Sequence, residues 1–209
     1  MYKTIIFDVD GTLIDTERAV LGSLRRMLKQ EYGLSYEQDD LAFVLGVPGA
    51  SVLQRLGAPD VAAANERWNE HMKDFKHTMS IFEGVTELLG ELYRRNVRMG
   101  IVTSKTKSEL RDDFIPFGLM EYLSVAVCAS DTSLHKPHPE PLQKFLELSG
   151  ADPCTSIYIG DTIYDYECAR SAGIAFGLAL WGAKSREGIH EQHALVSPSD
   201  VLTLIDDSL

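Results

Sequence analysis

The sequence has 209 residues, of which 44% are apolar and 24% are charged, a balance typical of a globular protein with a buried core. Its 31 acidic and 20 basic residues give a formal net charge of −11. This charge argues against a nucleic-acid-binding protein, because such proteins attract phosphates with clustered Lys and Arg. Three cysteines without CxxC spacing, Cys128, Cys154 and Cys168, argue against a disulfide framework and against a zinc site.

The sequence also lacks the signals of a membrane protein. Its longest uncharged apolar stretch, residues 172–183, is too short to span a bilayer and is interrupted by Gly173 and Gly177. No signal peptide is recognised at the N-terminus. We therefore expect a cytoplasmic protein without membrane contact.

The first predicted element is a buried strand at residues 4–7, which ends directly before Asp8, Asp10 and Gly11. From residue 83 onward, apolar strand-like runs alternate with helix-like segments. Such alternation predicts a doubly wound, Rossmann-like α/β fold around a parallel sheet. The later strands are predicted at residues 98–103, 123–129, 156–160 and 174–180, and the helices between them at 83–96, 107–117, 139–149 and 164–172.

Residues 15–81 interrupt this alternation. They contain helix-like segments at 17–32, 36–45, 50–56 and 60–77, separated by breaks rich in Gly and Pro. A βαβ unit takes about 30 residues, whereas the first two predicted strands are separated by more than twice that length. We therefore predict an α/β catalytic core at residues 1–14 and 82–209, and an inserted helical cap at residues 15–81.

Polar side chains follow the ends of the predicted strands. Ligands of open α/β sheets bind beyond the carboxyl ends of the strands, so we expect these side chains to meet there. They are Asp8 and Asp10 after the first strand, Thr103 and Ser104 after the second, Lys136 in a later loop, and Asp161 and Asp165 after the strand at 156–160.

The acidic members of this group predict a magnesium site. Carboxylates as close as those of Asp8, Asp10 and Asp161 repel one another unless a cation or a proton lies between them. Oxygen ligands without nearby His or Cys suit Mg²⁺. The sequence has no DxDxDG loop followed by Glu, the pattern that would indicate a calcium site. Asp165 adds a fourth carboxylate at the start of a helix.

The remaining members predict a phosphate substrate. Mg²⁺ and Lys136 would offset the charge of a phosphate dianion at this otherwise acidic point. The hydroxyl groups and main-chain N–H groups of Thr103 and Ser104, at a strand-to-helix junction, are suitable phosphate ligands.

These residues form four motifs whose order and spacing resemble those of the haloacid dehalogenase superfamily over the whole chain, and in detail its phosphoglycolate-phosphatase-like branch with a helical cap. The motifs are DVDGT at 8–12, VTS at 102–104, KPHPEP at 136–141 and GDTIYDYECARSAG at 160–173. The resemblance implies that Asp8 is the nucleophile and a magnesium ligand. It also implies that Asp10 is the general acid and base, with its main-chain carbonyl on the metal.

The same resemblance implies roles for the other motif residues. Thr103 and Lys136 hold the transferred phosphoryl group, Asp161 ligates magnesium, and Asp165 supports that site from nearby. The implied activity is magnesium-dependent hydrolysis of a small, phosphoglycolate-like phosphomonoester through a phosphoaspartate intermediate. The implied partner is a small phosphorylated metabolite, and we expect a monomer or a weak homodimer.

Several alternatives stay open within and outside this superfamily. A pyrophosphatase or a sugar-phosphate phosphatase fits the same motifs. A β-phosphoglucomutase fits less well, because such enzymes usually carry a His five residues after the Asp of an Asp-Thr pair, and here Asp15 is followed at that distance by Val20. A receiver-type signalling domain lacks the inserted helices, and a catalytically silent binding module would not need intact motifs.

Substrate choice is expected to depend on the predicted cap. Residues 45–49 (LGVPG) resemble the cap segment that faces the active site in this superfamily, although they also suit a plain helix break. Five basic residues could bind a substrate carboxylate or a second phosphate, although each is more typical of a solvated helix face. They are Arg18, Arg25, Arg55, Arg67 and Lys73.

Overall fold

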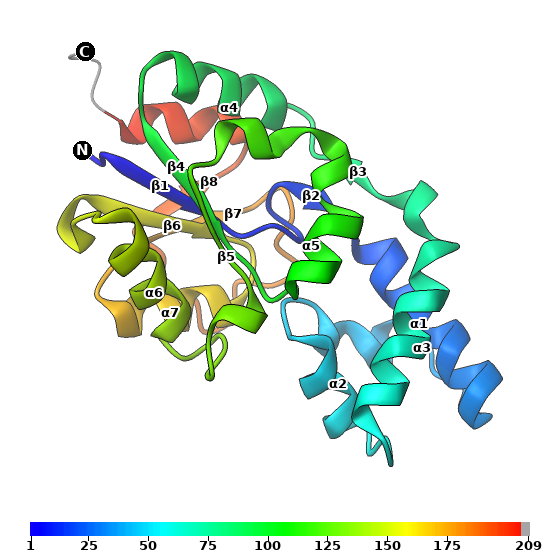
Figure 1. Cartoon of the computed structure of the whole chain (residues 1–209). Coiled ribbons are helices and arrows are strands. Elements are labelled where there is room, and N and C mark those ends of the chain that lie inside the picture. Colours follow the sequence, from blue (N-terminus) through cyan, green and yellow to red (C-terminus); the bar gives the residue numbers. More distant parts are fainter. Residues whose placement is uncertain (206–209) are drawn as a thin grey trace.

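The computed structural model describes residues 1–205. Their main feature is a six-stranded sheet of order β5-β4-β1-β6-β7-β8 (Figure 1). All neighbouring strands in this sheet are parallel, which confirms the predicted doubly wound α/β fold. The strands are β1 (Thr4–Phe7), β4 (Arg98–Val102), β5 (Val125–Val127), β6 (Ser156–Gly160), β7 (Ala175–Ala179) and β8 (His193–Leu195).

Helices cover both faces of the sheet (Figure 1). In β1, Ile5 and Phe7 pack into one core cluster with α4 (Val85–Arg94) and α5 (Lys107–Asp113). Ile6 points to the other cluster, which includes α6 (Glu140–Ser149) and α7 (Ile163–Ala172). Burial on both faces explains why β1 is apolar at consecutive positions.

A second unit of structure, here called the helical segment (residues 15–81), follows β1. It is attached through an antiparallel ribbon of β2 (Ile14–Asp15) and β3 (Ser80–Ile81). Its helices pack around a cluster of their own that includes Leu24, Met27 and Trp68. They are α1 (Glu17–Tyr32), the 3₁₀ helix η1 (Asp39–Val44), α2 (Gly49–Arg55), α3 (Val61–Lys73) and the 3₁₀ helix η2 (Lys76–Thr78).

The structure differs from the predicted elements mainly where elements are short. The helix expected at residues 36–45 is the 3₁₀ helix η1, and β2, β3 and β8 have only two or three residues each. Such strands leave no periodic pattern because alternation needs about four residues to be recognised. Further 3₁₀ turns are η3 (Ile115–Phe117), η4 (Leu119–Tyr122), η5 (Ala129–Asp131), η6 (Pro153–Thr155) and η7 (Pro198–Leu204). Within residues 1–205, no helix is both long enough and apolar enough to cross a membrane.

Candidate active site

The central position of β1 determines where the site lies. β1 pairs with β4 on one side and β6 on the other, in parallel. Asp8 directly follows β1, and its N–H donates to the carbonyl of Ile159 in β6 at 2.8 Å. Asp161 directly follows β6. Because the carboxyl ends of parallel neighbours lie at the same edge, the two aspartates meet beyond it.

Lys136 places a positive charge between two carboxylates at this edge. Its Nζ lies 2.8 Å from Asp8 Oδ1 and 2.7 Å from Asp165 Oδ1, and all three side chains are at most 2% exposed. Burial opposes the charge of the ammonium group, but Asp165 and Asp8 outweigh this effect and raise the pKa of Lys136. Lys136 is therefore protonated at neutral pH.

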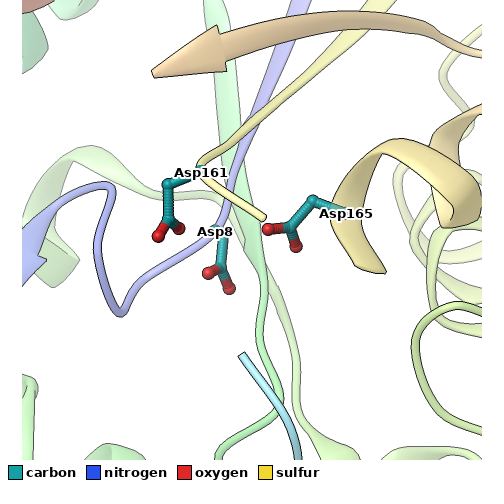
Figure 2. Close-up of side chains that lie close together, drawn as sticks. All are labelled: Asp8, Asp161 and Asp165. Atoms are coloured by element: carbon teal, nitrogen blue, oxygen red, sulfur yellow. The ribbon is translucent and has the colours of Figure 1, made fainter. Parts of the chain in front are cut away.

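Three buried carboxylates converge here, those of Asp8, Asp161 and Asp165, with oxygen atoms within 4.8 Å of one another (Figure 2). Burial raises the pKa of Asp8 to about 7, and the negative charge of Asp165 adds to this effect against the opposing charge of Lys136. Burial, followed by the charges of Asp165 and Asp8, raises the pKa of Asp161 well above its usual range. The two raised pKa values mean that ionisation of these carboxylates is disfavoured unless a further cation binds, and the all-oxygen donor set fits Mg²⁺.

Asp165 differs from the other two carboxylates because both of its oxygens already have hydrogen-bond partners. Oδ1 accepts from Lys136 and, at 3.0 Å, from the hydroxyl of Tyr158. Oδ2 accepts from the N–H of Thr162 at 3.0 Å and from its hydroxyl at 2.6 Å, in a capping box that starts α7. Asp165 therefore orients Lys136, whereas Asp161 accepts only the hydroxyl of Thr12 at 3.2 Å among the described residues.

Gly11 allows the chain to turn between Asp8 and the helical segment. Its φ is +80°, a conformation that residues with a Cβ rarely adopt. A Cβ at this position would also lie 2.2 Å from Asp161 Oδ2. The glycine of the DVDGT motif is therefore needed for both the turn and the close approach to Asp161.

Asp10 is held by a separate set of contacts. Its Oδ1 accepts from the hydroxyl of Thr16 at 2.7 Å and lies 3.1 Å from Nζ of Lys105. Lys105 is buried and also lies 3.4 Å from Asp113, which in turn pairs with Lys76 at 3.1 Å. Sequence reasoning missed Lys105 and Asp113, although the position of Lys105 directly after the VTS motif was a usable signal.

The structure corrects the expected role of the strand-to-helix junction after β4. Helix α5 begins at Lys107 and is capped by Thr106, so Thr103 and Ser104 lie before it. The N–H of Thr103 donates to Val127 at 2.9 Å and is not available to a phosphate. The hydroxyl of Ser104 donates to the carbonyl of Gly46 at 2.9 Å, which links this edge of the sheet to the helical segment.

A cavity of about 550 Å³ lies between the carboxylates and the helical segment. Leu45, Gly46, Val47 and Gly49 belong to its wall, so the segment at residues 45–49 faces the site. Its acidic lining residues are Asp8, Asp10, Asp15, Glu17, Glu109, Asp113, Asp161 and Glu187, and its basic ones are Lys105 and Lys184.

None of the five basic residues proposed for the cap lines this cavity within the part of the chain that the structure describes. The guanidinium of Arg55 stacks on the ring of Phe43 at 4.1 Å. Arg67 lies 3.9 Å from Glu31, and Lys73 lies 2.6 Å from Glu70. These side chains therefore belong to the outer surface of the helical segment.

Comparisons with known proteins agree with the predicted family. The model of the haloacid dehalogenase-like hydrolase family matches residues 5–179. The pyrophosphatase PpaX of Bacillus cereus (strain AH820) is 31% identical, and the match covers 98% of this chain and 97% of that protein. PpaX of Oceanobacillus iheyensis is 26% identical, with 99% and 98% coverage.

Solved structures give the same result. A protein of Lactobacillus plantarum, named as a candidate phosphoglycolate phosphatase, has a TM-score of 0.90 and 27% sequence identity, and the match covers 98% of this chain and 100% of that one. The fold, the motif positions and the match over residues 5–179 thus agree. The chain belongs to the haloacid dehalogenase-like hydrolase family, as its four motifs predict.

Proposed function

We propose that this hydrolase is a magnesium-dependent phosphatase that cleaves a small phosphorylated metabolite through a phosphoaspartate on Asp8. The observation that carries the proposal is the buried carboxylate of Asp8, which lies 2.8 Å from Nζ of Lys136 and close to Asp161. The nucleophile lies beside one fixed cation and a second carboxylate. An anionic phosphoryl group can approach such a nucleophile only when a metal ion is also bound. Relatives named as phosphatases support the same reaction class.

The residues that would hold magnesium are Asp8 and Asp161, together with the main-chain carbonyl of Asp10. Among residues 1–205, this carbonyl accepts no main-chain hydrogen bond. When bound, the metal would offset the charge of the carboxylates and of the phosphate. Asp165 would support the site by orienting Lys136.

The proposed reaction has two steps. An oxygen of Asp8 attacks phosphorus and forms the aspartyl phosphate, while the bond to the leaving oxygen breaks and Asp10 donates a proton to that oxygen. Water then attacks phosphorus, Asp10 takes its proton, and Asp8 is released with inorganic phosphate. In both steps the ammonium of Lys136 and the hydroxyl of Thr103 stabilise the charged phosphoryl oxygens. The main-chain N–H of Ser104, which donates no main-chain hydrogen bond within residues 1–205, helps to bind the substrate.

We further propose that residues 15–81 act as a cap on a catalytic core formed by residues 1–14 and 82–209. The apolar cluster that residues 15–81 form among themselves supports this division. The ribbon of β2 and β3 joins the two parts, and the hydroxyl of Ser104 donates to the carbonyl of Gly46 beside the cavity. A cap in this place would exclude water from the aspartyl phosphate until the leaving group departs.

A pyrophosphatase is the second candidate, because relatives with that name match almost the full chain. Phosphate release from a panel of phosphomonoesters and pyrophosphate, with Mg²⁺ and with excess EDTA, tests both candidates. We expect Mg²⁺-dependent release that Asp8→Asn abolishes. Asp152→Asn is the matched control, since Asp152 caps η6 away from the site and Asn caps equally well. Activity of Asp8→Asn within tenfold of the wild type, or full activity in EDTA, would contradict the proposal.

A further inference from the structure

One face of helix α3 forms the wall of the cavity that lies opposite the carboxylates. The side chains of Asn65, Trp68, Asn69 and Met72 line the cavity, at the i, i+3, i+4 and i+7 spacing of a single helix face. Asn65 and Asn69 are half-buried, and within residues 1–205 neither side-chain amide has a hydrogen-bond partner. Two neutral amides are thus available to a ligand.

The other side chains of this wall are apolar. Val20 comes from α1, and Phe43 and Val47 come from η1 and the segment after it. Trp68 is 6% exposed, and its indole N–H donates to the hydroxyl of Ser23 at 2.9 Å, which fixes the ring in place. These side chains therefore offer apolar surface and two neutral amides, and the charged residues that the helical segment adds to the cavity lining, Asp15 and Glu17, are both acidic.

The two lysines that line the cavity already have acidic partners. Lys105 lies between Asp10 and Asp113, and Lys184 pairs with Glu17. Lys136 pairs with Asp8 and Asp165 below the cavity. Within the described part of the chain, each of the two cations of the cavity lining thus has an acidic partner.

We propose that the substrate is the phosphate monoester of an uncharged, hydroxylated alcohol, whose hydroxyl groups bind to Asn65 and Asn69. This inference rests on the proposed phosphatase function and adds the class of leaving group. A carboxylate or a second phosphate would enter a cavity whose lining has eight acidic and two basic residues, and this excess of negative charge would repel it. The cavity of about 550 Å³ also has room for an alcohol larger than glycolate.

Two esters of equal length test this inference. Sorbitol 6-phosphate and 6-phosphogluconate are both open chains of about the same size, and they differ mainly in a terminal hydroxymethyl or carboxylate group. Pyrophosphate is the third substrate, and phenyl phosphate is the reference without leaving-group hydroxyls. We expect kcat/KM for sorbitol 6-phosphate to exceed that for 6-phosphogluconate and pyrophosphate by at least tenfold at saturating Mg²⁺.

The two asparagines are tested by Asn65→Ala and Asn69→Ala, which replace them with a residue that favours the helix. We expect each change to lower the ratio of kcat/KM for sorbitol 6-phosphate to that for phenyl phosphate by at least fivefold. Gln54→Ala is the control, because Gln54 lies on the exposed face of α2 outside the cavity lining. That variant should keep the wild-type ratio.

The outcomes separate this inference from the proposed function. Release of phosphate with equal or greater efficiency from 6-phosphogluconate or pyrophosphate would overturn the inference and leave the phosphatase function in place. A preference for the neutral ester that neither alanine variant changes would overturn the assignment to Asn65 and Asn69. No Mg²⁺-dependent release from any of the four compounds would instead contradict the phosphatase function itself.

Discussion

Replacing Asp8 by Asn should stabilise the metal-free protein at pH 8. The pKa of Asp8 is raised from a usual value of 3.8 to about 7, chiefly because the side chain is only 2% exposed. At about 1.4 kcal/mol per pH unit, this difference corresponds to an upper limit of about 4 kcal/mol for holding the ionised carboxylate in the folded state. The amide of Asn has no such charge and can still accept a hydrogen bond from Lys136.

The sign of the effect depends on pH. Between pH 3.8 and 7 the folded protein holds the proton of Asp8 more tightly than the unfolded chain does, so the free energy of unfolding of the wild type falls as the pH rises. Asp8→Asn lacks this dependence. The two proteins should therefore be similar in stability at pH 4, and the variant should be more stable at pH 8.

Urea or thermal unfolding in excess EDTA measures this difference. A gain of about 4 kcal/mol corresponds to a rise of about 10 °C in Tm for a chain of this length. The control is Asp200→Asn. The hydrogen bond from the N–H of Ser197 lowers the pKa of Asp200, so the ionised carboxylate stabilises the folded protein throughout the range from pH 4 to 8. The stability difference between this variant and the wild type should therefore be about the same at both pH values. A stability difference between Asp8→Asn and the wild type that is equal at pH 4 and pH 8 would refute the reasoning.

Three further predictions concern the metal and the proton donor. In a thermal shift assay, magnesium at a hundredfold excess over its Kd should stabilise the wild type by about 2.7 kcal/mol. It should stabilise Asp161→Asn much less, because this variant lacks one of the metal-binding carboxylates. Asp10→Asn should lower kcat/KM at least tenfold more for an alkyl than for an aryl phosphate, since an aryl leaving group needs little protonation. Gly11→Ala should abolish the magnesium-induced stabilisation, because its Cβ would clash with Asp161 at a φ of +80°.

Each of these predictions has an outcome that contradicts it. Equal magnesium-induced shifts in the wild type and in Asp161→Asn would place the metal elsewhere. If Asp10→Asn lowered kcat/KM by the same factor for the alkyl and the aryl phosphate, Asp10 would have a structural role. A wild-type response to magnesium in Gly11→Ala would show that the turn tolerates a Cβ, and Gly90→Ala, with open space around its Cβ, is the control.

The sequence by itself determined the fold class and the edge of the sheet that carries the site. The run at residues 4–7 is apolar on both faces, and the elements after residue 83 alternate in kind. Both are local patterns, because they depend on burial and on periodicity within one element. The rule that ligands bind beyond the carboxyl ends of parallel strands then places Asp8 and Asp161 together without any knowledge of side-chain packing.

Only the tertiary structure decided which groups touch. Lys136 is 128 residues from Asp8, and the loop that carries it has no periodicity from which a contact could be predicted. The same holds for Lys105 beside Asp10 and for Ser104 on Gly46, which join elements far apart in the chain. The elements that pack against a helix also decide which of its faces points toward the cavity and which points toward solvent. For this reason the arginines of the helical segment, which the composition suggested for substrate binding, lie outside the cavity, whereas Asn65 and Asn69 line it.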